Sequence, residues 1–208
     1  ENTIKNLKIW KDNISIEKIT GGITNQNFLV HEGNKKFFVR IGNDIPEHLI
    51  FRQNEISCSK AASLADIAPK LIHSAEGIIV FEYIKSITYD SKLVIQNLDQ
   101  IIEVIKNVHN KIPNFITGSP PLFWVFHVIK HYASFLKDND SSYTNLLDEF
   151  LSKSLKIDNA ASPYNIVFCH NDFLPANFIE SDSKIWVVDW EYAGFNTPLF
   201  DLGGLASN

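Results

Sequence analysis

The chain has 208 residues, 45% of them hydrophobic and 21% charged, which is typical of a globular protein with room for one substantial domain or two small lobes. Its net charge of −5 gives no basis for nucleic-acid binding, so an anionic ligand would need a local positive site or a metal ion. The longest aromatic and apolar run, residues 122–129, is too short to cross a membrane, and the distant cysteines Cys58 and Cys169 predict buried free thiols in a reducing compartment, the cytoplasm.

The first part of the chain is predicted to alternate strands with turns. Residues 14–19 and 28–31 are candidate strands, and the polar stretch GGITNQN at residues 21–27 lies between them. Its glycines allow a tight turn whose backbone N–H groups can face an anion, although a simple hairpin turn also accounts for it. Residues 36–41 form the next candidate strand, and Arg40 is the charge inside its apolar run. Arg40 is either a solvated residue of an edge strand or a guanidinium that binds phosphate oxygens in a bidentate way.

A helix is predicted for residues 46–64, with Pro46 near its start and good helix formers after it. Glu55 lies within this helix and is either an exposed residue or a partner for the cation of the preceding strand. Residues 78–84 then predict a buried strand with a polar exit.

Three further helices are predicted in the middle of the chain. Residues 98–112 show an apolar stripe at helical spacing, Pro113 ends this helix, and His109 near its end is expected to pack or cap rather than to catalyse. Residues 122–136 are rich in aromatic side chains, which usually pack in a core but can also wall a pocket for quaternary ammonium through cation–π contacts. Residues 141–155 carry a third apolar stripe, which we expect to face inward.

Carboxylate and amide side chains gather after two short apolar runs near the end of the chain. The runs at residues 165–169 and 185–188 are predicted strands, and Asp172, Asn177 and Asp189 follow them in loops. One carboxylate can accept the proton of an attacking hydroxyl, while an amide and a second carboxylate offer the oxygen ligands that Mg²⁺ prefers. The spacing H-x-D-x-x-x-x-N before an apolar strand that ends in aspartate therefore fits metal-assisted phosphoryl transfer. The alternative is a polar loop whose side chains serve only turns and caps.

The segments HNDFLPANF and VVDWEYAGFNTPLFDLGGL resemble those of choline kinases, particularly bacterial ones, within the kinase-like superfamily that also holds aminoglycoside phosphotransferases. Asn196, Pro198 and Asp201 fall where the choline kinase pattern has N-x-P-x-x-D. Asn171 departs from the glycine that these relatives more often carry after the histidine of the loop.

The resemblance implies an α+β, two-lobed protein-kinase-like fold. A small antiparallel-sheet N-lobe over residues 1–84 would carry the phosphate loop, the strand arginine and the helix glutamate. A mainly helical C-lobe over residues 85–208 would carry the catalytic and metal-binding loops. In the resembled family the chain continues for several helices beyond the element that starts at Asp201, so we expect this sequence to lack its C-terminal helices.

The resemblance also implies transfer of the γ-phosphoryl group of ATP to the hydroxyl of a small amino alcohol, with choline favoured and Mg²⁺ as the metal. Asp172 would be the catalytic residue that binds the substrate hydroxyl and accepts its proton, and Asn177 and Asp189 would hold the metal. Glu191 would assist at the metal or meet the cationic head group of the acceptor. The implied nucleotide-binding residues are Gly21, Gly22, Thr24, Asn25, Arg40, Glu55, Glu82 and Ile84, the last two marking the hinge whose backbone faces adenine.

The acceptor stays open at this level, because parts of the family's acceptor cage come from the region after Asn208. Ethanolamine, thiamine and aminoglycosides are alternatives, although an aminoglycoside would favour a strongly acidic cleft and the C-terminal half is not unusually acidic. A different class, a kinase-like protein that binds nucleotides without catalysis, also stays open. The intact Asp172, Asn177 and Asp189 argue against a degenerate site.

Overall fold

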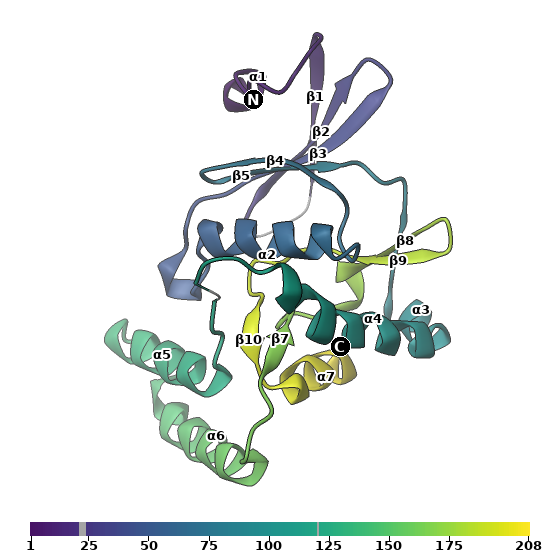
Figure 1. The fold of residues 1–208 in the computed structure, drawn as a ribbon. Coiled ribbons are helices and arrows are strands. Elements are labelled where there is room, and N and C mark those ends of the chain that lie inside the picture. Colours follow the sequence, from purple (N-terminus) through teal and green to yellow (C-terminus); the bar gives the residue numbers. More distant parts are fainter. Residues whose placement is uncertain (21–23, 120) are drawn as a thin grey trace.

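The structure of the protein is a computed structural model that describes residues 1–20, 24–119 and 121–208. A five-stranded antiparallel sheet occupies one end of the molecule and a mainly helical part occupies the other, with helix α2 (Arg52–Leu64) between them (Figure 1). The expected α+β arrangement is therefore confirmed. The division of the chain at residue 84 stays a prediction.

The N-terminal sheet is antiparallel throughout, with its strands in the order β1-β2-β3-β5-β4. After the short helix α1 (Asn2–Lys5), its strands are β1 (Ile14–Ile19), β2 (Gln26–Glu32), β3 (Lys35–Ile41), β4 (Leu71–Ala75) and β5 (Ile78–Glu82). Because successive side chains of a strand point to opposite faces, Val39 packs with Phe28 and Val80 on one face while Arg40 points to the other. The Arg40 face is turned toward α2, where its side chain meets Glu55.

Helix α2 begins later than the sequence predicted. Pro46 starts only a short 3₁₀ turn, η1 (Pro46–His48), after which Leu49 adopts a left-handed φ of 58°. A residue in that conformation cannot continue a right-handed helix, so the predicted start at residue 46 is wrong. The helix starts at Arg52, whose backbone N–H donates to Asp44 Oδ1 at 2.7 Å.

The helical part is built around α4, whose buried Ile101, Ile105 and Val108 pack in one core with Phe168 and Trp190. Its helices are α3 (Ser91–Gln96), α4 (Leu98–Lys111), α5 (Val125–Asp138), α6 (Leu147–Ala161) and α7 (Pro198–Ser207), with 3₁₀ turns η2 (Ile112–Phe115), η3 (Thr144–Leu146) and η4 (Pro175–Asn177). The predicted helix over residues 98–112 is thus confirmed. No helix in the described parts of the chain is both long and apolar enough to span a bilayer.

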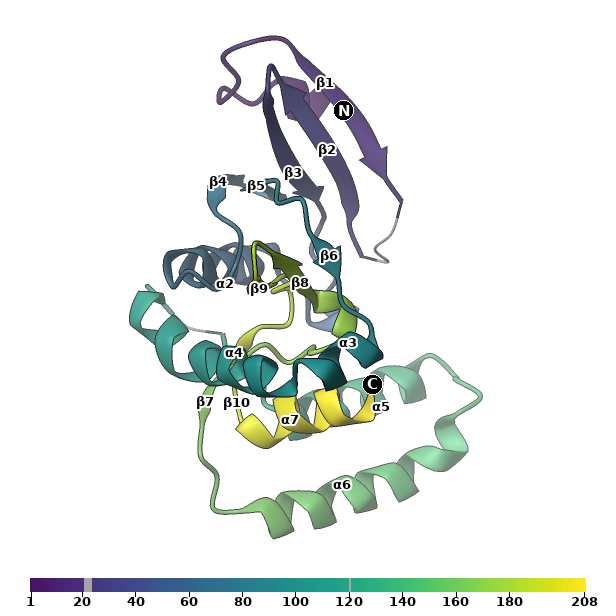
Figure 2. The same cartoon turned by 90° about the vertical axis from the view of Figure 1, so that its right-hand side faces the viewer.

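Helices α5 and α6 both begin and end further along the chain than predicted. Figure 2 shows α6 at the outer edge of the helical part, and it packs against α5. Leu147 is buried, but Phe150 and Leu155 are 50% and 57% exposed. The expectation that the whole apolar stripe faces inward is therefore wrong, because α5 covers only part of it.

Two small sheets position the predicted catalytic and metal-binding loops. Strand β7 (Val167–Cys169) pairs with β10 (Gly194–Asn196), and β8 (Phe178–Ser181) pairs with both β9 (Lys184–Val187) and β6 (Ile87–Thr88). The chain leaves β7 through residues 170–177 into β8 and leaves β9 through residues 188–193 into β10. The two loops lie side by side, since Val188 N–H donates to Asn177 O at 3.0 Å.

Candidate active site

A buried carboxylate of helix α7 holds the loop that follows β7. Asp201 accepts the backbone N–H groups of His170 at 3.0 Å and Asn171 at 2.7 Å. From α4, His109 Nε2 lies 2.9 Å from Asp201 Oδ2, so His109 packs in this part of the core. This Asp201 brace fixes the backbone directly before Asp172 through hydrogen bonds to a charged acceptor.

His109, Cys169 and Asp201 bring a nitrogen, a sulfur and an oxygen atom within 4.8 Å of one another. Their contacts are nevertheless those of a hydrogen-bonded core. Cys169 Sγ donates to Thr197 O at 3.6 Å, and burial, followed by the charge of Asp201, raises the pKa of this thiol. Because each of the three side chains is hydrogen-bonded within the protein, we interpret them as part of the Asp201 brace.

His170 is fully buried beneath the loop. Its ring stacks on Phe173 with centroids 4.7 Å apart and meets Trp190 at 4.8 Å. Burial lowers the pKa of His170, which favours the neutral ring. Its Nε2 lies 3.0 Å from Val188 O, a contact that a proton on Nε2 would satisfy. His170 therefore ties the catalytic loop to the chain just before Asp189.

Asn177 orients Asp172. Its Nδ2 donates to Asp172 O at 2.7 Å and to Asp172 Oδ2 at 3.2 Å. Burial raises the pKa of Asp172 to about 6, the charge of Asp189 adds to this effect, and the hydrogen bond from Asn177 opposes it. Such a carboxylate is largely ionised at neutral pH and is basic enough to accept a proton.

Asp189 follows β9 in a left-handed conformation with a φ of 70°, which is uncommon for a residue other than glycine. Its Oδ1 lies 2.5 Å from Arg40 Nη1, and the same nitrogen lies 3.0 Å from Glu55 Oε1. Burial disfavours the charge of Arg40, but Asp189 and Glu55 outweigh it and raise the pKa of the guanidinium. Arg40 thus joins the carboxylate of α2 to the carboxylate after β9.

Glu191 contacts the segment just before β2 in the same region. Thr24 Oγ1 donates to its two oxygens at 3.0 and 2.9 Å, and Asn25 Nδ2 donates to Oε2 at 3.1 Å. Arg52 Nη1 lies 3.0 Å from Glu191 Oε2 and 2.6 Å from Glu55 Oε2. The sequence analysis missed Arg52, although its spacing of three residues from Glu55 on one helix was a signal for their ion pair.

The structure brings most of the predicted site residues into one region. The residues gathered there are Thr24, Asn25, Arg40, Glu55, Asp172, Asn177, Asp189 and Glu191. Gly21 and Gly22 lie outside the described residues. Glu82 and Ile84 lie at the exit of β5, where Glu82 N–H donates to Lys70 O at 2.8 Å, so an adenine contact at this hinge stays a prediction.

An aromatic side chain that the sequence analysis did not single out lies next to the carboxylates. Tyr192 follows Glu191 and is half-buried, and its ring meets that of Phe123 edge-on with centroids 6.0 Å apart. Phe123 in turn lies 5.9 Å from Phe200. Burial raises the pKa of the Tyr192 hydroxyl, and Tyr132 and the site carboxylates add to this effect. The Tyr192 phenol therefore lies within the field of the carboxylates.

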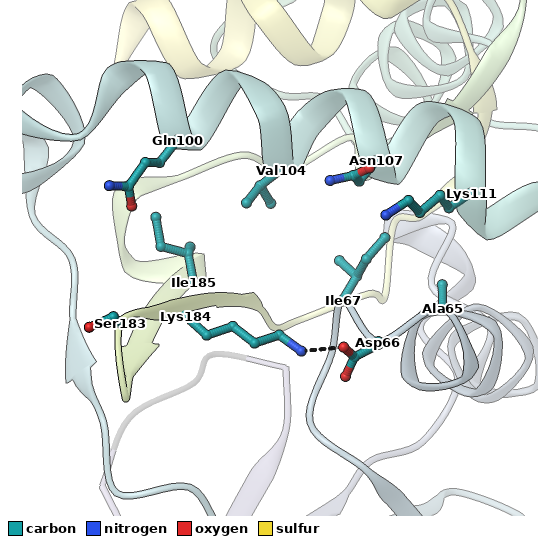
Figure 3. A pocket seen from close by; sticks show the side chains of 10 residues that line it. All are labelled: Ala65, Asp66, Ile67, Gln100, Val104, Asn107, Lys111, Ser183, Lys184 and Ile185. Atoms are coloured by element: carbon teal, nitrogen blue, oxygen red, sulfur yellow. Dashed lines mark ion pairs between the residues drawn. The ribbon is translucent and has the colours of Figure 1, made fainter.

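A cavity of about 420 Å³ lies elsewhere, between α4 and the turn that joins β8 to β9 (Figure 3). Val104 of α4 faces it, and on the opposite side Lys184 Nζ forms an ion pair with Asp66 Oδ2 at 2.6 Å. No predicted site residue is among the described residues that line this cavity, so it is separate from the candidate active site.

Comparison with known protein families shows to which family the chain belongs. Residues 16–205 match the family described as choline/ethanolamine kinase. The chain belongs to this family. The family that the loop sequences predicted is thereby confirmed.

Two curated relatives match most of this chain. Protein LicA of Haemophilus influenzae is 27% identical over 189 residues, a match that covers 88% of this chain and 55% of that protein. Ethanolamine kinase 2 of Mus musculus is 26% identical over 208 residues, covering 93% of this chain and 53% of that protein. The chain thus spans about half the length of these relatives.

Solved structures confirm the protein-kinase-like fold. Choline kinase LicA from Streptococcus pneumoniae has a TM-score of 0.78 and 29% identity, with 98% of this chain and 71% of that chain covered. The structure of LicA in complex with AMP gives a TM-score of 0.79 at the same identity and coverage. The sheet lobe and helical lobe therefore have the architecture of a choline kinase.

Proposed function

We propose that the protein is an Mg²⁺- and ATP-dependent phosphotransferase that phosphorylates the hydroxyl of a small amino alcohol, with choline as the favoured acceptor. The observation that carries this proposal is the convergence of Asp172, Asn177 and Asp189 from two neighbouring loops beside Arg40. A base, two oxygen ligands and a buried cation are the groups that phosphoryl transfer requires. The family, with choline and ethanolamine kinases among the relatives, supports the class of acceptor.

Asp172 would act as the general base. Its backbone is fixed by the Asp201 brace on one side, and its carboxylate is oriented by Asn177 on the other. A pKa of about 6 keeps most of Asp172 ionised at neutral pH, so it can accept the proton of the acceptor hydroxyl during attack. Because both supports are rigid, the geometry is set before substrate binds.

Asn177 and Asp189 fit a magnesium ion by the chemistry of their donor atoms. Asn177 turns Nδ2 toward Asp172, which directs its amide oxygen elsewhere, and Asp189 is a carboxylate on the adjacent loop. Mg²⁺ takes few protein ligands and prefers oxygen, so two such residues suffice when phosphate oxygens complete the shell. When bound, the ion would neutralise negative charge on the phosphate groups.

Arg40 would bind the nucleotide phosphates. It is a buried guanidinium held between Glu55 and Asp189, and it stays charged in that position. We propose that the loop with Gly21, Gly22, Thr24 and Asn25 covers the phosphates and that the hinge at Glu82 to Ile84 faces the adenine. The AMP complex of LicA supports nucleotide binding in this fold.

The acceptor would lie beside Tyr192, next to the carboxylates. A half-buried aromatic ring near negative charge suits a quaternary ammonium group, which cannot donate hydrogen bonds but binds aromatic faces. Ethanolamine is the second candidate, favoured by the similarity to ethanolamine kinase 2. The predicted contact between Glu191 and the acceptor stays a prediction. We further propose a cytoplasmic location, which the two free, buried cysteines support.

A coupled ADP-release assay with Mg·ATP on the full-length protein tests the proposal. Choline, ethanolamine, thiamine and kanamycin are compared as acceptors, and Asp172→Ala and Asp189→Ala serve as inactive controls. We expect turnover with choline above the other three. Turnover with another acceptor would keep the kinase chemistry and reject choline. If no acceptor gives ADP release although ATP binding is measurable, a non-catalytic nucleotide-binding protein is favoured. An active Asp189→Ala variant would overturn the metal assignment.

A further inference from the structure

We propose that Arg52 is a positioning residue that, with Glu191, clamps Thr24 and Asn25 of the predicted phosphate loop onto the loop that carries Asp189, before any nucleotide binds. The inference rests on the proposed function, because it names the residues that would preform the nucleotide site. It also assigns Glu191 to this clamp rather than to the acceptor or the metal.

Every nitrogen atom of the Arg52 guanidinium donates to a protein group. Nε donates to Asn43 O at 2.9 Å, and Nη2 donates to Thr24 O at 3.1 Å. Nη1 lies between two carboxylates, 2.6 Å from Glu55 Oε2 and 3.0 Å from Glu191 Oε2. The side chain is only 5% exposed. Because each of its nitrogen atoms already donates to a protein acceptor, we expect Arg52 to hold the protein in position and not to bind phosphate.

Glu191 accepts hydrogen bonds from two residues of the predicted phosphate loop, Thr24 and Asn25. Its oxygens accept from the Thr24 hydroxyl and from the Asn25 amide, and Asn25 Nδ2 also donates to Thr24 Oγ1 at 3.1 Å. Glu191 lies two residues after Asp189, so these hydrogen bonds tie the segment just before β2 to the loop that carries the predicted metal ligand. The clamp consists of Thr24, Asn25, Arg52 and Glu191.

The charges alternate along one buried chain of ion pairs. Arg40 lies between Asp189 and Glu55, and Arg52 lies between Glu55 and Glu191. Glu55 accepts from Arg40 with Oε1 and from Arg52 with Oε2. Arg52 therefore helps to orient Glu55, and Glu55 in turn orients Arg40, the residue predicted to bind phosphate. Carboxylates buried in this way need their cations, because an unpaired buried charge is strongly unfavourable.

The backbone next to the clamp leaves no room for a larger residue. A Cβ atom on Gly42 would stand 2.8 Å from both Cζ and Nε of Arg52, and it would also overlap Asn25 Oδ1. A guanidinium with four protein acceptors cannot move away without losing hydrogen bonds. The glycine is thus a second, independent sign that the position of Arg52 is built into the fold.

The test separates nucleotide binding from acceptor binding. The dissociation constant of ADP is measured by calorimetry on the full-length protein, with and without Mg²⁺, alongside the KM values for ATP and for the best acceptor. The variants are Glu191→Gln, which removes the charge, and Thr24→Val, which removes one hydroxyl donor. Arg52→Lys keeps the charge but loses the planar fork. Glu149→Gln and Thr144→Val, both at exposed positions of the helical part, are the matched controls.

We expect Glu191→Gln and Thr24→Val each to weaken ADP binding and raise the KM for ATP by roughly five- to tenfold, in the range of coupling between sites. The KM for the acceptor should change less than about twofold, and Arg52→Lys should weaken ADP binding in the same way. The Glu191→Gln/Thr24→Val double variant should cost less than the product of the two single losses, because both substitutions weaken the shared Thr24–Glu191 contact. The loss of ADP affinity should appear without Mg²⁺, since the clamp needs no metal.

Three results would overturn the inference. Wild-type ADP affinity in both variants would show that the clamp does not position the loop. A rise confined to the KM for the acceptor would show that Glu191 binds the acceptor, and a loss seen only with Mg²⁺ would place Glu191 at the metal. If Glu191→Gln does not fold, Thr24→Val alone decides. A wild-type protein that binds no ADP would reject the proposed function itself, whereas normal binding by both protein and variants would reject only the clamp.

Discussion

Replacing Asn171 with glycine sets two physical effects against each other. Asn171 has a φ of 65°, a left-handed conformation that glycine adopts without strain, and related loops more often carry glycine here. Its side chain, however, is 9% exposed and fully engaged. Nδ2 donates to Tyr192 O at 2.9 Å and to Gly194 O at 3.3 Å, and Oδ1 accepts from Asn196 Nδ2 at 2.9 Å.

The side-chain term is the larger one. Relief of the left-handed backbone strain should stabilise the folded protein by about 1 kcal/mol. The greater conformational freedom of glycine in the unfolded chain should destabilise it by roughly 0.5–1 kcal/mol. The lost hydrogen bonds contribute about 1 kcal/mol each. Asn196, which is 0% exposed, would also keep a donor without an acceptor. We therefore expect Asn171→Gly to lower the free energy of unfolding by about 2–4 kcal/mol.

Urea unfolding monitored by tryptophan fluorescence measures this change, because Trp190 is buried against His170 beside the loop. In a thermal unfolding experiment, the Tm should fall by about 5–15 °C for a chain of this length. Ser183→Gly is the matched control: Ser183 has a φ of 61° but an exposed side chain, so its stability should change by less than about 0.5 kcal/mol. An Asn171→Gly protein as stable as wild type would refute the reasoning, since the relief of backbone strain would then fully offset the lost hydrogen bonds.

Four further predictions follow from burial and charge. Because Asp172 must be ionised to accept a proton and its pKa is about 6, kcat/KM should rise about tenfold from pH 5 to pH 7, and a flat profile would contradict that role. This pKa lies above the ordinary value of 3.8, so the contribution of Asp172 to stability is present at acid pH and is lost as the pH rises through about 6, a loss that Asp172→Asn should remove from unfolding curves. Gly42→Ala should cost about 1–3 kcal/mol of unfolding free energy through overlap with Arg52, whereas Gly203→Ala, whose Cβ would meet none of the described atoms within 4 Å, should not; equal Tm values for the two variants would count against the overlap. Burial raises the pKa of Cys58 to about 12 and raises that of Cys169 as well, so a thiol reagent at pH 8 should label the protein only after denaturation, and rapid labelling of the native protein would disprove burial.

The sequence by itself predicted the family and much of the local structure. The spacing from His170 to Asn177 and the aspartate after the next strand predicted metal-assisted phosphoryl transfer. The resemblance of the segments around them to choline kinases predicted the family, which is confirmed. The apolar stripe of residues 98–112 predicted α4, and the runs of strand-forming residues in the first part of the chain predicted β1, β2, β3 and β5 but not β4. Side-chain periodicity follows directly from backbone geometry, which is why these elements could be predicted.

Only the tertiary structure decided how the residues of the site are connected. Arg52 and Glu191 are 139 residues apart, and nothing in either local sequence indicates their contact. The late start of α2, the exposed stripe of α6 and the position of Tyr192 were likewise missed. Local patterns report the preferences of neighbouring residues, whereas a buried ion pair between distant segments exists only after packing has brought the two charges together and excluded water from both.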